Sequence, residues 1–216
     1  MTELLPLNPD ELLSTTRAVR KRLDFDRPVP ESLVRECIDI AFQAPTGSNR
    51  QGWHFMVVGD PAKKQALADL YGRAFDPYVN MPPPAYGEGD TRAVRGAAVK
   101  DSATHLRENF HRAPWLVIPV MEGRPPADGG AFFQASAWGS LLPAFWNFML
   151  AARARGLGTA WTTLHLPFEE EASELLGIPF AKYTQGGMTP LAYTLGTDFK
   201  AAPRLDAASL VHVDTW

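Results

Sequence analysis

The chain contains very little cysteine, since Cys37 is the single one in 216 residues. A lone thiol excludes a disulfide framework within the chain. Cys37 shares a helical spacing with Val34, Ile38 and Ala41, which predicts a buried helix residue. The sequence also lacks an apolar run of about 18 residues and a cationic start that leads into a signal core. These absences predict a cytoplasmic protein without a membrane segment.

An excess of positive charge is missing as well, because 21 Lys and Arg residues face 24 Asp and Glu residues, for a net charge of −3. This balance disfavours a nucleic-acid partner. No HxxxH spacing occurs, so no metal site is expected. P-loop and Gly-x-Ser-x-Gly sequences are absent too. Gly156 and Gly158 follow a helix-like run, so we interpret them as a helix stop and not as a dinucleotide fingerprint.

What remains is the composition of an ordinary globular domain, 45% hydrophobic and 21% charged. No repeat or linker divides the chain, so a single domain over residues 1–216 is expected. Residue patterns predict helices that begin at Pro9, with Asn8 as the cap, and at Pro61, with further helices over 30–42, 94–110, 131–155 and 167–176. They predict strands over 53–59, 113–121, 159–164 and 190–196. Helices interspersed with strands indicate a layered α/β or α+β fold.

Three segments allow more than one interpretation. Residues 76–92 are rich in proline and glycine, which suits either a lid over a site or a mobile insertion. The helix over 131–155 is apolar nearly all round, so it is a central core helix or a subunit-interface helix, with a bend at Pro143. Residues 211–216 could add an edge strand to the sheet of this chain or to that of a partner subunit.

The loop over residues 45–53 is unusually polar for a helix-to-strand connection. Gly47 permits a positive φ, and Ser48, Asn49 and Gln51 offer short polar groups beside exposed backbone N–H groups. Such a loop is suited to wrap a planar ligand that forms several hydrogen bonds. A solvated turn without a ligand is the alternative.

A basic cluster precedes this loop, with Arg17, Arg20, Lys21 and Arg22 close together. If the stretch is helical, Arg17 and Arg20 share a face and can converge on a phosphate. The alternative is a basic helix end that complements the helix dipole.

Several motifs, in order from about residue 15 to residue 204, resemble those of the FMN-dependent nitroreductase superfamily. TTRAVRKRLDFDRPVP resembles its opening R-R-S-V-R-x-F motif, and PTGSNRQGWHF resembles its P-S-x-x-N-x-Q-P-W-x-F loop. ARGLGTAW, ELLGIP and PLAYTLG, with Arg204 downstream, are similar to its later elements. Ala18, Gly52 and Arg22 depart from the usual serine, proline and aromatic residue, which suggests a divergent branch.

The resemblance implies an α+β fold, a three-layer α/β/α sandwich around a mostly antiparallel sheet, that forms a homodimer. It implies FMN in clefts at the dimer interface, with NAD(P)H as the reductant in a ping-pong cycle. The implied cofactor-binding residues are Arg17, Ala18, Arg20, Pro45, Thr46, Gly47, Asn49, Thr162, Thr163, Leu164 and Arg204. Arginines 17, 20 and 204 would hold the phosphate and ribityl chain. Residues 45–47 would line the flavin, and Asn49 would hydrogen-bond its ring edge.

The chemistry then belongs to the cofactor, so no catalytic side chain is expected. The small-molecule electron acceptor would be a nitroaromatic, a quinone or an enone. Two alternatives remain open at this point. One is a specialised flavin enzyme of the same superfamily, acting by flavin fragmentation or reductive dehalogenation. The other is a flavin-binding protein without turnover.

Overall fold

The computed structural model of the protein describes residues 3–82, 84–87 and 90–216, and its fold is α+β. The helices are α1 (Pro9–Thr15), α2 (Glu31–Ala41), α3 (Pro61–Tyr78), α4 (Thr91–Asn109), α5 (Gly130–Ala154) and α6 (Glu169–Leu176). The strands are β1 (Leu23–Asp24), β2 (Trp53–Val58), β3 (Trp115–Glu122), β4 (Leu157–Thr159), β5 (Tyr183–Gln185) and β6 (Thr189–Thr194). None of the helices within the described residues is both long and apolar enough to cross a membrane.

The strands form one antiparallel sheet with β3 at its centre. β3 pairs with β2 along one edge, and with β6 and then β5 along the other. β6 in turn pairs with β1 and β4, so that the main path runs β1-β6-β3-β2. The predicted mostly antiparallel sheet is therefore confirmed.

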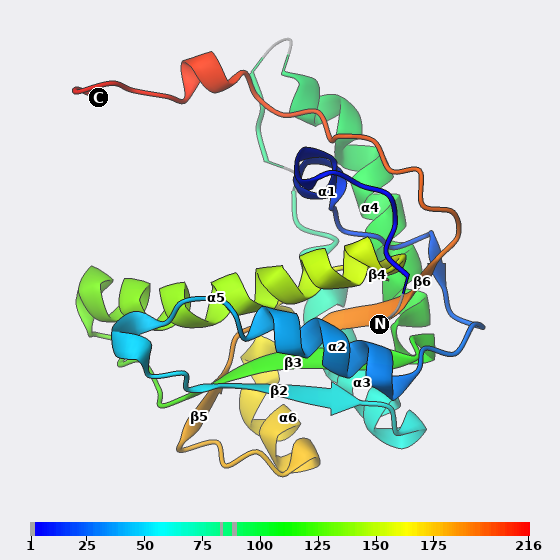
Figure 1. Ribbon diagram of the computed structural model, residues 1–216, viewed down its shortest axis with the longest axis vertical. Coiled ribbons are helices and arrows are strands. Elements are labelled where there is room, and N and C mark those ends of the chain that lie inside the picture. The colour runs from blue at the N-terminus through cyan, green and yellow to red at the C-terminus, as the bar shows by residue number, and fades with distance from the viewer. Residues whose placement is uncertain (1–2, 83, 88–89) are drawn as a thin grey trace.

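Alternation along β3 divides the core into two layers of helices. Leu116, Ile118 and Val120 pack with α3 and α6 on one face, whereas Val117 packs with α2 and α5 on the other. Figure 1 shows α2 and α5 together on one side of the sheet and α6 on the opposite side. This arrangement is the expected three-layer sandwich.

Two helix starts occur where the sequence predicts them, because a side chain caps each one. The Asn8 side chain accepts a hydrogen bond from the Glu11 amide at 2.9 Å, and the Glu11 carboxylate accepts one from the Asn8 amide. Asp60 accepts from the Lys63 amide at 2.9 Å, and α3 then carries Leu67 and Tyr71 into the core.

The segment after α1 is extended, which corrects the assumption of a helical basic cluster. Thr16 ends the helix with an extended backbone (ψ 128°), and Ala18 then forms a parallel bridge with Thr159. Successive side chains of an extended segment point to opposite sides. Arg17 and Arg20, three residues apart, consequently do not share a face.

The strand predicted over 159–164 is displaced toward the N-terminus. β4 ends at Thr159, and Thr162 keeps only an isolated bridge with Met188. Gly156, with φ 74°, ends α5 as predicted. Gly158 instead lies inside β4, where an added Cβ would stand 2.8 Å from atoms of Leu23 and Thr194. The predictions also missed β5, whose three residues carry little periodicity.

Two other segments differ from the sequence-based expectation. α3 continues through Pro77 to Tyr78 and α4 begins at Thr91, so the irregular connection is shorter than 76–92, and residues 83, 88 and 89 lie outside the described part. Residues 211–216 form no strand within the described chain, and the tail extends away from the body of the molecule (Figure 1).

α5 is buried only along its C-terminal half. Leu141, Phe145 and Phe148 are fully buried, whereas Phe132 and Phe133 are 76% and 56% exposed. The interpretation as a core helix therefore holds for the second half of α5, and the interpretation as a subunit-interface helix stays a prediction for its first turns. The helix continues without a break through Pro143.

Candidate functional site

The loop before β2 is held in an unusual backbone conformation. Ser48, Asn49 and Gln51 all have positive φ values of 52–53°, a region that residues other than glycine rarely adopt. The Thr46 hydroxyl accepts a hydrogen bond from the Gln51 backbone amide at 3.1 Å, and the Gln51 side-chain amide donates to the Asn49 side-chain oxygen at 2.9 Å. Strain maintained by such internal bonds is typical of functional loops.

This loop is also attached to α5. The Gly47 amide donates to the Ser140 hydroxyl at 3.0 Å, and that hydroxyl donates to the Ser136 carbonyl at 2.9 Å. The loop position is thus fixed relative to the exposed first half of the helix. Pro45 and Asn49 are themselves exposed, so both are accessible to a ligand.

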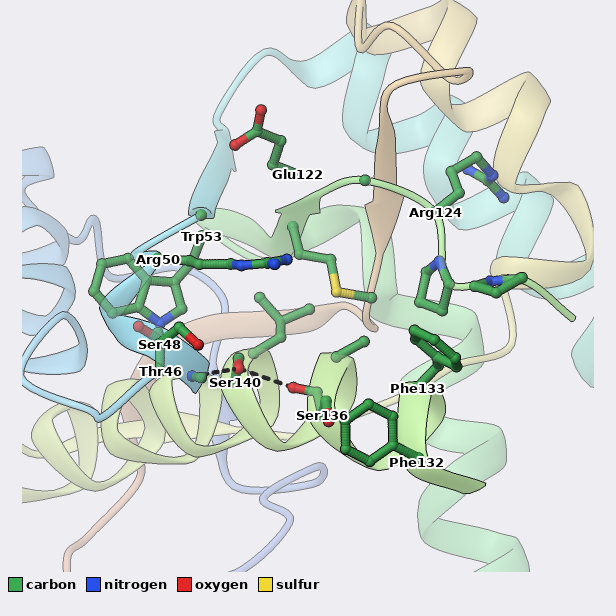
Figure 2. A pocket seen from close by; sticks show the side chains of 18 residues that line it. Thr46, Ser48, Arg50, Trp53, Glu122, Arg124, Phe132, Phe133, Ser136 and Ser140 are labelled. Atoms are coloured by element: carbon green, nitrogen blue, oxygen red, sulfur yellow. Dashed lines mark hydrogen bonds between the residues drawn. The ribbon is translucent and has the colours of Figure 1, made fainter. Parts of the chain in front are cut away.

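A cavity of about 640 Å³ lies between this loop, the end of β3 and the first half of α5. We call it the loop pocket. Figure 2 shows its wall, with Arg50 and Trp53 on one side and Phe132 and Phe133 on the other. Thr46 and Gly47, two of the predicted residues, line it.

Several residues of this pocket were missed by the sequence reasoning, namely Arg50, Arg124, Phe132 and Phe133. One signal was available. Adjacent residues on a helix lie on different faces, so Phe132 and Phe133 cannot both face one core. Arg124 gave no such signal, since it follows β3 in a turn.

A second cavity, of about 510 Å³, gathers the cations predicted to hold a phosphate. It is lined by Arg17 and Arg204, with Arg92, Arg95 and Tyr86 beside them, and we call it the arginine pocket. Arg17 donates to the Lys200 carbonyl at 3.1 Å, which ties it to the C-terminal segment. Arg92 is paired with Asp90 at 2.6 Å. Guanidinium groups gathered in this way suit a phosphate.

Arg20 does not line the arginine pocket. Its charge instead acts on Tyr71. Burial raises the pKa of this tyrosine to about 12, and the positive charge of Arg20 opposes the rise with a smaller effect. Arg17 and Arg20 therefore act at different places, as their positions on an extended segment require. Ala18 is exposed beside β4.

The segment from Thr162 to Leu164 is anchored at its two ends. The Thr162 amide and carbonyl exchange hydrogen bonds of 2.8 Å with Met188, and the Leu164 amide donates to the Thr162 hydroxyl at 3.2 Å. Thr163 is exposed between them, and its amide donates no hydrogen bond within the described residues. That amide is available to a ligand.

A buried polar network begins directly after this segment. His165 is fully buried, and its Nε2 lies 3.0 Å from the Gln185 side-chain oxygen Oε1. The Gln185 side-chain Nε2 donates to the Glu169 backbone carbonyl at 3.2 Å, which can only accept, and to the Ser173 hydroxyl at 2.9 Å. Oε1 is therefore the acceptor, and the neutral imidazole carries its proton on Nε2. Burial lowers the pKa of His165 to about 4, an effect that the Gln185 hydrogen bond partly offsets.

This network reaches the wall of the loop pocket. The backbone amide of Gln185 donates to the Glu169 carboxylate at 2.8 Å, and this carboxylate pairs with Arg124 at 2.7 Å. Arg124 also donates to the Tyr183 carbonyl at 2.7 Å. The guanidinium of Arg124 is therefore neutralised and held in place.

The two pockets share no lining residue, so one chain does not bring the 45–49 loop next to Arg17 and Arg204. Among the described residues, no group of three or more His, Cys, Asp or Glu side chains could hold a metal ion.

Comparison with known proteins assigns the chain to a family. The family model described as "Nitroreductase family" matches residues 13–193, which is most of the chain. The chain belongs to the nitroreductase family. The resemblance inferred from its motifs is thereby confirmed.

Individual members of the nitroreductase family agree with this assignment. A 4-nitrobenzoate reductase from Nocardioides sp. (strain LMS-CY) is 29% identical over 198 residues, which cover 79% of this chain and 74% of that protein. Two solved structures share the fold. Iodotyrosine deiodinase bound to FMN and 3-iodo-L-tyrosine has a TM-score of 0.70 at 22% identity, with 96% of this chain and 99% of that chain covered. The FMN-dependent nitroreductase NfnB from Mycobacterium smegmatis in complex with NADPH has a TM-score of 0.66 at 21% identity, with 95% and 97% covered.

Proposed function

We propose that this nitroreductase-family oxidoreductase binds FMN and uses NADH or NADPH in a ping-pong cycle to reduce a small electron-poor acceptor. The observation that carries the proposal is the meeting of Arg17 and Arg204 in one pocket. These residues lie at opposite ends of the chain, and both belong to motifs that resemble the phosphate-binding residues of the family. FMN, when bound, supplies the two-electron chemistry.

The residues of this chain fit the two halves of such a ligand. The arginine pocket offers guanidinium groups for the phosphate, with Arg17 and Arg204 as the principal contacts. The strained loop offers Pro45, Thr46 and Gly47 to the ring and Asn49 to its edge. The free amide of Thr163, between Thr162 and Leu164, is proposed to face the reactive ring nitrogen.

Because the two halves are separate within one chain, we propose that a homodimer assembles each site. Exposed apolar side chains on α2 and α5 that line neither pocket, Ile40 and Trp146, supply apolar surface for this contact. The loop of one subunit would then face the arginine pocket of its partner. Light scattering should give a dimer, and dilution into the monomer range should release FMN.

Three further expectations stay predictions. The protein is expected in the cytoplasm, and residues 1–216 are expected to form a single domain. The third expectation is a lid formed by the connection between α3 and α4. Tyr86, within this connection, lines the arginine pocket, which supports a lid on that side.

The decisive experiment is an absorption spectrum of the purified protein, followed by anaerobic addition of NADPH or NADH. A flavin spectrum that either nucleotide bleaches supports the proposal. A flavin protein that neither reduces would favour a specialised reaction or binding without turnover. The fold shared with iodotyrosine deiodinase is the observation that keeps the specialised reaction as a second candidate. A colourless protein that cannot be reconstituted with FMN would refute the proposal.

The phosphate assignment can be tested with two ligands that differ only in that group. Arg17→Ala combined with Arg204→Ala should weaken FMN binding at least tenfold, since a hydrogen bond to a charged group contributes about 1.5–3 kcal/mol, and should leave riboflavin binding nearly unchanged. Arg20→Ala should weaken both ligands if Arg20 contacts the ribityl chain. Arg35→Ala, on the exposed face of α2, is the matched control. Equal losses for FMN and riboflavin in the double variant would exclude a phosphate contact.

A further inference from the structure

The loop pocket contains an arginine without a protein partner. The guanidinium of Arg50 forms no hydrogen bond or ion pair within the described residues, although it lines the cavity. Figure 2 shows this side chain reaching across the pocket, with Trp53 beside its base. An arginine directed into a cavity and left unpaired is a candidate anchor for an anion.

Hydrogen bonds hold the backbone on both sides of Arg50, which sets the point from which its side chain enters the pocket. Arg50 itself has ordinary helical angles (φ −68°, ψ −30°), but Asn49 before it and Gln51 after it both have positive φ. The hydrogen bonds of Thr46 and Gln51 maintain this conformation. A strained turn that presents one side chain to a cavity indicates a ligand-binding role.

The other charges of the pocket do not change this conclusion. Arg124 is occupied by Glu169 at 2.7 Å and by two carbonyl groups. Figure 2 shows the Glu122 carboxylate directed away from the interior of the pocket. Among the described residues that line the pocket, the guanidinium of Arg50 is therefore the one unpaired positive charge. A single positive charge suits a single carboxylate better than a phosphate dianion.

Most of the remaining wall is apolar and partly aromatic. Phe132 and Phe133 are exposed and pack edge to face, with centroids 5.3 Å apart and an angle of 82° between the rings. Met121 and Leu141 add further apolar wall to the same cavity. An aromatic ring is the natural complement of such a surface. The cavity, at about 640 Å³, has room for this ring beside part of a flavin.

We infer that the acceptor reduced at this site is an aromatic carboxylate, with its carboxylate on Arg50 and its ring against Phe132 and Phe133. This inference rests on the proposed function, because it specifies the acceptor of that same site. For a nitrobenzoate, NAD(P)H supplies a hydride and solvent supplies a proton. The nitroso compound, water and the oxidised nicotinamide are then formed.

The first test is binding without turnover. Calorimetric titration of the FMN-loaded protein with benzoate and with neutral benzamide should show tighter binding of benzoate by about tenfold, the ratio that one charged hydrogen bond provides. Arg50→Gln should bring the two affinities together, and Arg35→Gln should preserve the difference. Equal affinities for benzoate and benzamide in the wild-type protein would overturn the inference.

The second test is acceptor preference. The ratio of kcat/KM for 4-nitrobenzoate to that for its methyl ester should exceed tenfold and fall close to one in Arg50→Gln. A wild-type ratio near one, with both acceptors reduced, would overturn the inference and leave the proposed function standing. A flavin protein that NAD(P)H bleaches but that reduces neither acceptor would overturn the inference alone, whereas a flavin protein that neither nucleotide bleaches would overturn both. If Arg50→Gln changed the KM of NADPH and not the acceptor ratio, Arg50 would bind the reductant, and the inference would be wrong.

Discussion

Acid is expected to destabilise this fold through one buried side chain, His165. Burial keeps the imidazole neutral, because it lowers the pKa from the ordinary 6.5 to about 4 in the folded chain, against smaller opposing effects of the Gln185 hydrogen bond and the Glu169 charge. Between these two values the unfolded chain binds a proton that the folded chain does not. The free energy of unfolding therefore rises with pH in this window and falls as the solution is acidified.

The size of the effect follows from the two pKa values. Because the unfolded chain gains a proton, the free energy of unfolding should be about 2 kcal/mol lower at pH 5 than at pH 8. Below pH 4 the total decrease should approach about 3 kcal/mol. The assay is urea unfolding followed by tryptophan fluorescence at fixed protein concentration, at several values between pH 4 and 8. Carboxylates contribute their own pH dependence, so the quantity of interest is the difference between variants.

His165→Asn removes the titrating ring and should flatten the dependence by about 2 kcal/mol between pH 8 and 5, whatever its effect on absolute stability. The exposed His212, changed to Asn, is the matched control and should keep the wild-type slope. Identical slopes in wild type and His165→Asn would refute the assignment of a neutral buried imidazole.

Three further predictions concern packing, capping and reactivity. Gly158→Ala should lower the free energy of unfolding by about 1–3 kcal/mol in urea titrations, because its Cβ would collide with neighbouring strands at 2.8 Å; an unchanged midpoint would contradict this. Asp60→Ala should lower the free energy of unfolding by about 1 kcal/mol in the same assay, because it removes the cap of α3. Asp60→Asn should keep most of the wild-type stability, since Asn also caps helices; equal losses in the two variants would point to charge instead of capping. Cys37 is fully buried with its pKa raised to about 12 by burial, so a thiol reagent should label it only after unfolding.

The helices and long strands were predictable because their signals are local. Asn8 and Asp60 act as caps whatever surrounds them, and the runs of β2 and β3 are apolar apart from His54 and Glu122. β5 could not be predicted in this way. Its three residues pair with β3 only because the chain returns there, and their own pattern does not specify a strand.

The candidate site was predictable in part. Arg17 and Arg204 were identified from motifs, and the structure brings them into one pocket. Their separation from Arg20 depends on how Thr16 ends α1, a choice that the basic residues themselves do not encode. Phe132 shows the opposite limitation. Its spacing matched a core position, but the helix projects beyond the core at that point, which only the tertiary fold determines.

The division of α5 into a buried and an exposed half has a consequence for how relatives of this protein can diverge. Substitutions at Leu141 or Phe145 alter the packing of the core and are constrained by stability. Phe132 and Phe133 contribute little to that core, yet they form the wall of the loop pocket. Mutations there can accumulate with little loss of folding free energy. This helix thus gives evolution a region in which ligand preference can change while the fold is preserved.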